Sequence, residues 1–451
     1  MNHIKQFTQT YWYYLPVIII AVVFNSLDLG IIGLTLLVVL MCLSLIVNDD
    51  FAPVMVTLGA CVYTLHEYPV TTTYYIVFGA LLAVFLPCLA YFIYKNIKTG
   101  VRFSLGKFFV PLVLIVVAFI LGGIFSPYYS IESVGFGFII SICALVTYLL
   151  VYNFTKTSFK DLAFDIFSVV SVIIILQMWW GYLASGDIIA MMQNKDVRVG
   201  VGEINLPAMT IGMWIPLLLA KGLNSKYDYL YVLASLFAFV NVVFSFSRGA
   251  LLFTMIFGFL SLIMFFIKTK RKKNVSITLG STFAVALIVI IISMPSIIDM
   301  MKHYIERGFD DTGRFELYNQ ALDSFTAFPA FGVGWMVDTY GFVFAQFHST
   351  PLQYLACTGV IGVLLILPHY LQRYKSFIKG GNIYTFFACM CILICEGYGL
   401  IDQTSTFAMT YIYAFILMLA CEESKKALPS DKTELVYDDI NLANTKEYRG
   451  D

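Results

Sequence analysis

Three side chains in this 451-residue sequence stand where their chemistry could be used: Arg248, Arg314 and His348. Arg248 lies in a short polar break, Phe-Ser-Phe-Ser-Arg-Gly-Ala, between two apolar segments, and Arg314 follows the run Asp-Asp-Thr-Gly. His348 stands just before another apolar segment. A guanidinium binds phosphate through two parallel hydrogen bonds, and an imidazole can take a proton from a hydroxyl near neutral pH. The three residues therefore suggest two phosphate-binding groups and one general base.

Each of the three residues also has an ordinary structural interpretation. Arg248 could be an arginine that reaches from an apolar segment to the membrane interface. Arg314 could form a surface ion pair with Glu316 or Asp310. His348 could cap or pack the start of the helix that follows it. Position alone leaves both interpretations open.

The composition decides which solvent surrounds these residues. Hydrophobic residues make up 60% of the chain and charged residues only 12%, whereas a soluble domain has about 45–50% and 25%. One aqueous core cannot hide that much apolar surface. This excludes a soluble enzyme, a disordered protein and a nucleic-acid binder, although the net charge is zero.

The elements that must position the three side chains are membrane helices. A helix of about 20 apolar residues spans a bilayer. The sequence predicts an all-α polytopic membrane protein with about 12–14 transmembrane helices, because the second, third, eighth and last of the candidates are short or weakly bounded. The fourteen candidates are 11–27, 31–47, 51–66, 74–94, 108–126, 134–153, 162–183, 206–220, 229–246, 250–267, 275–293, 351–371, 383–400 and 405–421.

The basic residues predict the orientation of these helices, since Lys and Arg gather in cytoplasmic loops. With the N-terminus in the cytoplasm, 22 of the 28 basic residues lie inside, among them the run 268–273 and Arg373, Lys375 and Lys379, assigned to an inner loop. Arg248, Arg314 and His348 then lie on the outer face. The six outer basic residues are Lys195, Arg198, Arg248, Lys302, Arg307 and Arg314.

The longest outer segment is the only one with room for a subdomain outside the membrane. It contains an amphipathic helical pattern at 313–328 that stops at Pro329, with Thr312 as a possible cap, and a Gly-rich turn follows at 331–335. The predicted organisation is transmembrane helices 1–11 in residues 1–293, an extracytoplasmic loop at 294–350, C-terminal transmembrane helices at 351–421 and a cytoplasmic tail at 422–451.

Taken together, the three residues suggest one reaction class. Two arginines at one outer-leaflet site suit a diphosphate, the histidine suits deprotonation of an attacking hydroxyl, and the lipid surroundings suit a polyprenyl carrier. The reaction would displace a lipid diphosphate from the anomeric carbon of a sugar. No His, Cys, Asp or Glu set has the spacing of metal ligands, so neither a metal nor a cofactor is expected.

Three motifs resemble those of the bacterial O-antigen ligase and O-antigen polymerase superfamily. They are Ser247-Arg-Gly-Ala250 before an apolar helix; Gly313-Arg-Phe-Glu-Leu-Tyr-Asn-Gln-Ala-Leu322 with Pro329 and Gly332-Val-Gly334; and His348-Ser349, nine residues, then Gly359-Val-Ile-Gly362. Their order and spacing agree with the family, and the whole match covers about residues 200–365. The count of fourteen helices exceeds the roughly twelve of ligases.

The resemblance implies a membrane glycosyltransferase of the C-type architecture in the bacterial cytoplasmic (inner) membrane, with an active site facing the periplasm or exterior. Its donor would be an undecaprenyl-diphosphate-linked glycan, bound by Arg248 and Arg314, with His348 as base and no metal. The enzyme would polymerise O-antigen, capsular or exopolysaccharide repeat units, or ligate a glycan to lipid A–core or to another lipid or protein. A chain-length regulator or other polysaccharide assembly proteins would be its partners.

A flippase or exporter is a further alternative of a different class. It would carry charged residues along several helices, whereas the intramembrane charge in this sequence is nearly confined to Arg248 and Glu396.

Overall fold

The structure is a computed structural model that describes residues 2–65, 72–195, 197–200, 202–223, 225–292, 313–337, 346–404 and 407–426. Its elements are α1 (Asn2–Thr8), the 3-10 helix η1 (Tyr11–Tyr13), α2 (Tyr14–Ser26), α3 (Gly30–Val47), α4 (Ala52–Val62), α5 (Thr72–Lys98), α6 (Phe109–Leu121), α7 (Ile131–Phe154), α8 (Phe159–Ala184), α9 (Ile188–Asn194), β1 (Arg198–Val199), β2 (Gly202–Glu203), α10 (Asn205–Gly222), α11 (Asp228–Phe244), α12 (Arg248–Lys268), α13 (Lys272–Ile292), α15 (Arg314–Ala327), α16 (Thr350–Gly380), α17 (Ile383–Ile401) and α18 (Ala408–Lys426).

The predicted all-α polytopic membrane fold is confirmed. Each of the fourteen predicted apolar ranges coincides with a helix, and among the described residues seven helices are long and apolar enough to cross a membrane. The described strands are a single short antiparallel pair, β1 and β2. Polar residues set several helix starts: the side chains of Ser130, Ser158 and Asn382 accept hydrogen bonds from backbone amides in the first turns of α7, α8 and α17.

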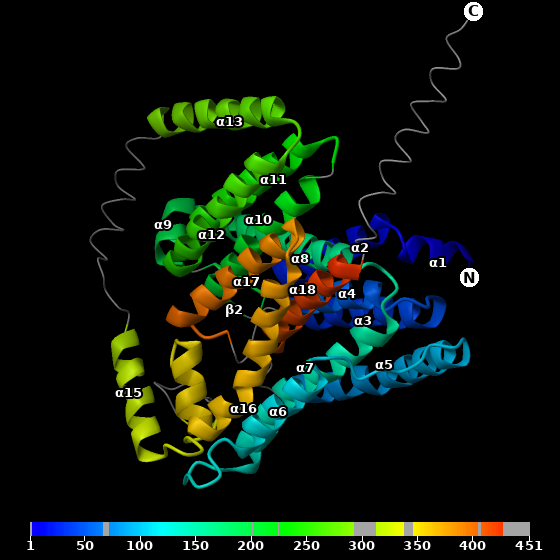
Figure 1. The fold of residues 1–451 in the computed structure, drawn as a ribbon, viewed down its shortest axis with the longest axis vertical. Helices are drawn as coiled ribbons and strands as arrows, with labels where there is room; N and C mark the ends of the chain where they lie inside the picture. Colours follow the sequence, from blue (N-terminus) through cyan, green and yellow to red (C-terminus); the bar gives the residue numbers. More distant parts are fainter. Residues whose placement is uncertain are drawn as a thin grey trace, which may run out of the picture.

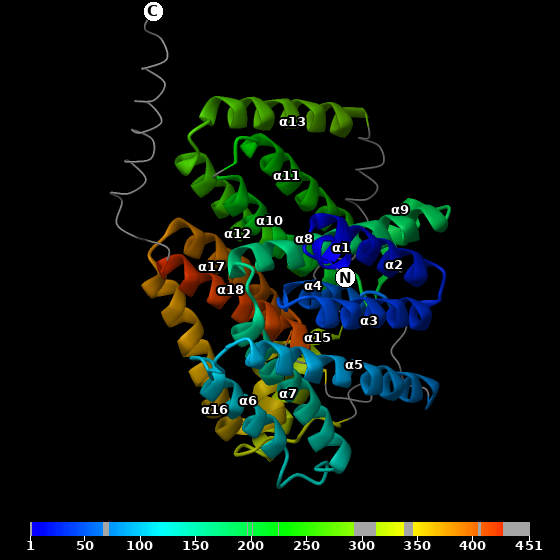
Figure 2. The same ribbon diagram turned by 90° about the vertical axis from the view of Figure 1, so that its right-hand side faces the viewer.

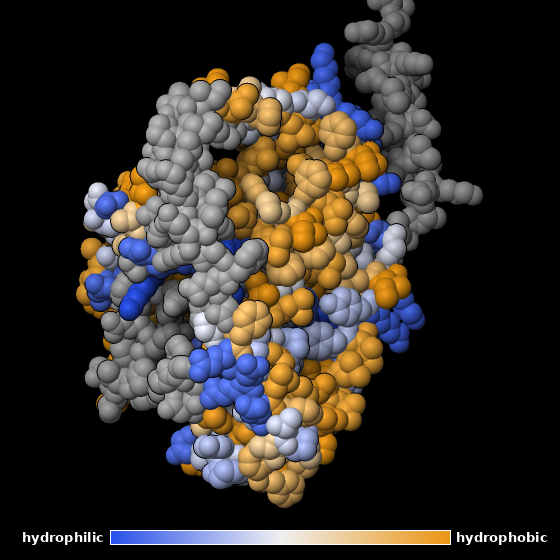
Figure 3. All heavy atoms as spheres, turned by 90° about the vertical axis from the view of Figure 1, so that its left-hand side faces the viewer, coloured by the Kyte–Doolittle hydropathy of each residue, from blue (hydrophilic) through white to orange (hydrophobic). Residues whose placement is uncertain are grey.

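The helices form one bundle (Figures 1 and 2). In both views α13 lies at one edge and α6 and α16 at the other. Near the middle, α10 packs against α8, α11, α12 and α17. The face shown in Figure 3 is largely hydrophobic, with a hydrophilic patch over α15. Large apolar side chains such as Phe259 and Leu364 are exposed on the bundle surface, which fits a lipid environment.

Ion pairs gather at one end of the bundle, which we call the basic end. It holds the connections between α3 and α4, α7 and α8, α10 and α11, and α12 and α13. Asp49 pairs with Lys5 and Lys156, and Lys221 pairs with Asp161. Consecutive helices alternate in direction, so the connections between α6 and α7, α11 and α12, and α17 and α18 lie at the opposite end, which we call the site end.

The Gly-rich segment predicted as a turn at 331–335 has a larger structural role. Residue Gly359 breaks α16 with φ +64°, which leaves backbone groups without helical partners. The amides of Val333 and Gly334 donate to the carbonyls of residues 356 and 357, and the amides of residues 360 and 361 donate to the carbonyls of residues 329 and 330. The segment therefore supplies hydrogen-bond partners for the backbone groups that the break in α16 leaves unpaired, and it holds the chain after α15 against α16.

One assignment from the sequence is wrong. Arg373 was placed in an inner loop, but α16 continues to Gly380 and buries Arg373 to 4% exposure, where it pairs with Glu396 of α17. The loop assignment failed because the apolar run ends near residue 371, while the helix itself continues to Gly380. Intramembrane charge thus includes Arg373 as well as Arg248 and Glu396.

Asp310 and Thr312, considered in the sequence, lie outside the described residues, and so do two further histidines, His66 and His303. The described part of the predicted outer loop is residues 313–337 and 346–350. There the amphipathic helix is present as α15, which ends two residues before Pro329 as its pattern predicted.

Candidate active site

The centre of the site is Asp402, the residue that ends α17 at the site end of the bundle. Its carboxylate lies 3.0 Å from Nδ1 of His348 and accepts a 2.7 Å hydrogen bond from the Tyr398 hydroxyl. The backbone amide of Gln403 also donates to it, at 2.8 Å. Nη2 of Arg314 lies 3.8 Å from its other oxygen. Two of the three predicted residues therefore meet on one carboxylate.

The electrostatics of Asp402 favour its charged form. Burial by itself would raise the pKa of the carboxyl, but the hydrogen bond and charge of His348, the Tyr398 hydroxyl and the Arg314 guanidinium together hold this pKa below its ordinary value. An ionised carboxylate only accepts hydrogen bonds, so Nδ1 of His348 carries a hydrogen, and in the neutral form of the ring Nε2 holds the lone pair. The pair thereby prepares His348 to accept a proton at Nε2.

His348 is held in an uncommon conformation just before α16. Its φ is +46°, in the left-handed region that residues other than glycine rarely adopt. Its carbonyl accepts a hydrogen bond of 3.3 Å from the Tyr318 hydroxyl of α15, and the amide of buried Phe347 donates to the Gln353 side chain. Strain of this kind often marks functional sites. The side chain is 27% exposed, so a substrate can reach it.

Arg314 is the first residue of α15. Gly313 occupies the N-cap position with φ +77°. Leu317 and Ala321 form the buried stripe of α15, and α15 packs against α16, the helix that follows His348. The ion pair that the structure describes for Arg314 is with Asp402, and not with the neighbouring Glu316; Asp310 lies outside the described residues.

Arg248 is the first residue of α12, and the residue after it packs against the end of α17. A methyl group added at Gly249 would lie 2.3 Å from the Cδ1 atom of Ile401 and 3.3 Å from the ring of Tyr398. Arg248, which is half-buried, thus begins its helix beside the segment that carries Tyr398 and Asp402. All three predicted residues lie at the site end.

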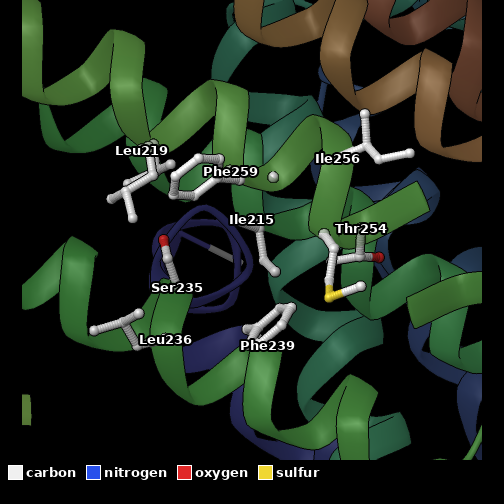
Figure 4. Close-up of a pocket in the computed structure, with 11 residues that line it drawn as sticks. Ile215, Leu219, Ser235, Leu236, Phe239, Thr254, Ile256 and Phe259 are labelled. Carbon is white, nitrogen blue, oxygen red and sulfur yellow. The ribbon is translucent and has the colours of Figure 1, made fainter. Parts of the chain in front are cut away.

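An apolar groove lies between α10, α11 and α12 (Figure 4). It has a volume of about 540 Å³. Thr254, its first lining residue on α12, follows Arg248 by six residues, or roughly 9 Å along a helix. Apart from Ser235 and Thr254, its walls are apolar or glycine. The groove is lined by Ile215 and Leu219 of α10, Ser235, Leu236 and Phe239 of α11, and Thr254, Met255, Ile256, Gly258, Phe259 and Leu262 of α12.

Sequence reasoning missed Asp402 and Tyr398. A signal was present: Asp402 follows an apolar run directly, and the alternation of helices puts it on the same side as His348. A buried carboxylate next to an apolar helix requires a partner, and the predicted topology puts His348 on the same face. In the described part of the chain, no three His, Cys, Asp or Glu side chains gather as metal ligands would.

The fold and the site together define a polytopic membrane protein with a His–Asp pair and two arginines at one end of its bundle. Residues 233–367 match the family model described as O-antigen ligase, and this match confirms the resemblance to the O-antigen ligase and polymerase superfamily. The matched segment includes Arg248, Arg314 and His348 and ends before Asp402. It supports an enzyme of the ligase or polymerase type. No curated protein matches the chain.

Proposed function

We propose that this protein transfers a glycan from undecaprenyl diphosphate to an acceptor hydroxyl on the outer face of the bacterial cytoplasmic membrane. The observation that carries the proposal is the meeting of His348, Asp402 and Arg314 at one end of a membrane bundle. The acceptor would be a second lipid-linked repeat unit, so that the enzyme polymerises O-antigen, capsular or exopolysaccharide.

In the proposed reaction, His348 Nε2 takes the proton of the acceptor hydroxyl as its oxygen attacks the anomeric carbon of the donor glycan. A bond forms between these two atoms, and the bond between the anomeric carbon and the diphosphate oxygen breaks. Undecaprenyl diphosphate leaves with the electron pair. Arg248 and Arg314 would stabilise its developing charge. Asp402 stabilises the imidazolium that His348 becomes.

The groove beside α12 supports a lipid-linked donor. Its walls offer few polar partners and its rim residue Phe259 is exposed on the membrane-facing surface. A chain of isoprene units is apolar and would gain from burial there. With the diphosphate at Arg248, the chain would descend along α12 into the groove.

The outward orientation rests on the basic residues. The basic end carries Lys5, Lys156, Lys221 and the run 268–273, as cytoplasmic loops do. The site end would then face the periplasm or exterior, where lipid-linked glycans are polymerised or ligated.

A ligase is the second candidate function. Its acceptor would be lipid A–core or another lipid or protein instead of a second repeat unit. The His348-Ser349 motif favours it, and the family model that matches is described as O-antigen ligase. A flippase would need a polar route through the bundle, and the reconstitution below tests for transport as well.

The experiment is reconstitution of the purified protein in vesicles with an undecaprenyl-diphosphate-linked repeat unit. Chain growth without another acceptor supports a polymerase, and transfer only to an added lipid or protein acceptor supports a ligase. Movement of the lipid-linked glycan across the membrane with no transfer would overturn the proposal. Arg314→Ala should weaken use of the donor more than use of the acceptor, and Asp161→Asn at the basic end serves as the control.

A further inference from the structure

A second charged cluster lies inside the bundle, on the same two helices that carry the catalytic pair. Arg373 of α16 forms an ion pair with Glu396 of α17. Nη2 of Arg373 lies 2.7 Å from Nε2 of His369. The same guanidinium lies 4.7 Å from the centre of the Tyr370 ring. His369 is fully buried. Charges in such a place are expensive and usually functional.

The cluster sits beneath the catalytic pair. Glu396 precedes Asp402, the C-cap residue of α17, by six residues, or roughly 9 Å along a helix. A small cavity lies between the ion pair and the segment after Asp402: its walls include Arg373, Glu396 and Thr404. The amide of Thr404 donates a 2.9 Å hydrogen bond to the Thr350 hydroxyl, two residues after His348. The ion pair and the catalytic pair are thus neighbouring links between α16 and α17.

The cavity has the size and chemistry of an internal water site. Space for the centre of a water molecule is about 10 Å³, close to what one water requires. Nε of Arg373 is buried without a hydrogen-bond partner, and Arg373 lines the cavity. The hydroxyls of Thr404 and Thr410 line the same cavity. One water bound there would complete the hydrogen bonds of the guanidinium.

We propose that Arg373 and Glu396 are a positioning pair that holds the end of α17, and with it Asp402, at the correct distance from His348. This inference rests on the proposed role of His348 as base. Helix geometry alone does not fix that distance, because α16 is broken at Gly359 and contains Pro368. The ion pair between α16 and α17 connects the two helices near the catalytic residues and so constrains the distance between His348 and Asp402. The pair touches no substrate and acts only through Asp402.

Stability and positioning make different predictions for the removal of both charges. Removing one partner leaves an unpaired buried charge, whereas replacing both with apolar residues of similar volume is often neutral or stabilising. A pair that only stabilised the fold would therefore leave turnover intact in the double variant. A positioning pair would leave the fold intact and lower turnover, since small misplacements of catalytic groups are costly.

The test compares Arg373→Met/Glu396→Leu with the wild-type protein in the vesicle transfer assay. We expect similar yield and Tm, an unchanged KM for the donor, and kcat lower by about tenfold or more. Arg373→Lys, which keeps a charge opposite Glu396, should recover most of the turnover. Lys221→Met/Asp161→Leu, which removes the ion pair at the basic end, should leave kcat unchanged. Wild-type kcat in the Arg373/Glu396 double variant would overturn the proposal.

Two further variants keep the test decisive. If the double variant does not fold, Glu396→Gln keeps the shape of the side chain, and unchanged kcat in it would equally overturn the proposal. The triple variant, which adds Asp402→Asn to the double variant, should have the same kcat as Asp402→Asn alone, because the effects of residues that act through one another are not additive. If the losses in kcat add, the pair does not act through Asp402. Full activity of His348→Ala would instead remove the proposed base, whatever the ion-pair variants do.

Discussion

Asp402→Asn isolates the contribution of the carboxylate to the candidate site. Asn has nearly the same shape, so the Tyr398 hydroxyl, which donates to Oδ2 of Asp402, can still donate to the amide oxygen. The Gln403 amide, which donates to Oδ1 beside His348, loses its acceptor when the amide NH2 takes that place. The negative charge beside His348 and Arg314 is lost. The new amide can also donate to Nδ1 of His348, which would place the ring hydrogen on Nε2. In that tautomer the histidine cannot accept the proton of the acceptor.

The magnitude follows from the role assigned to His348. A positioned general base contributes about 10²–10⁴-fold to a reaction. Loss of the correct tautomer removes most of that contribution; the corresponding Asp-to-Asn change in a Ser-His-Asp triad lowers turnover about 10⁴-fold. We expect kcat of Asp402→Asn to fall about 10²–10⁴-fold, with a smaller change in the KM of the donor, since Arg248 and Arg314 remain.

The assay is glycan transfer in reconstituted vesicles at matched protein amounts, with donor binding measured separately. Turnover within about threefold of wild type, in a folded protein, would refute the assignment of Asp402 to His348; this threshold lies far below the smallest expected base contribution. The pH dependence of stability gives an independent check. The folded-state pKa of Asp402 lies below its ordinary value of 3.8, so its stabilising contribution is present above that pH and is lost as the pH falls further. Asp402→Asn should lack this acid-dependent loss.

Four further predictions concern individual positions. Arg248→Lys keeps the charge but not the bidentate geometry, so transfer should fall severely at equal expression; near wild-type transfer would favour an interfacial arginine instead. His348→Asn can hydrogen-bond but not take a proton at neutral pH, so kcat should fall about 10²–10⁴-fold while His303→Ala stays near wild type; a fully active His348→Asn would remove the base. Gly359→Ala should lower yield and Tm, since the added methyl would lie 2.5 Å from the carbonyl carbon of Ala330; unchanged thermal unfolding would contradict this. A reporter fused after Ala330 should behave as extracytoplasmic, and cytoplasmic behaviour would reject the orientation.

The fold was predictable because lipid imposes a simple pattern on sequence. Apolar runs of helix length are visible without knowledge of any partner, and every predicted run is a helix. The amphipathic stripe of α15 and its end before Pro329 were equally local signals. The extent of α16 was not, because its last turns contain Arg373 and Lys375. Those polar residues are helical because Arg373 finds Glu396 on another helix, and such a partner cannot be read from local composition.

The site was partly predictable for the same reason. Arg248, Arg314 and His348 are polar residues at the edges of apolar runs, so each was visible by itself. Asp402 was overlooked because it lies in a short connection where a carboxylate needs no explanation. Only the packing of α17 against α12 and α16 shows that it is buried and faces His348. A role that arises from two distant segments meeting requires the three-dimensional structure.

The spacing of the three motifs has a mechanical explanation in the fold. After His348, the first part of α16 runs from Thr350 to Thr358, roughly 13 Å of helix, and then breaks at Gly359. The break receives the segment that follows α15, and a side chain at Gly359 would collide with Ala330 and Gly332. The distance from His348 to Gly359 thus sets where the chain after α15 docks. Since α15 begins at Arg314, the same docking sets where its guanidinium meets Asp402. The glycines therefore permit the segment after α15 to pass close to α16, and this contact places Arg314 opposite His348.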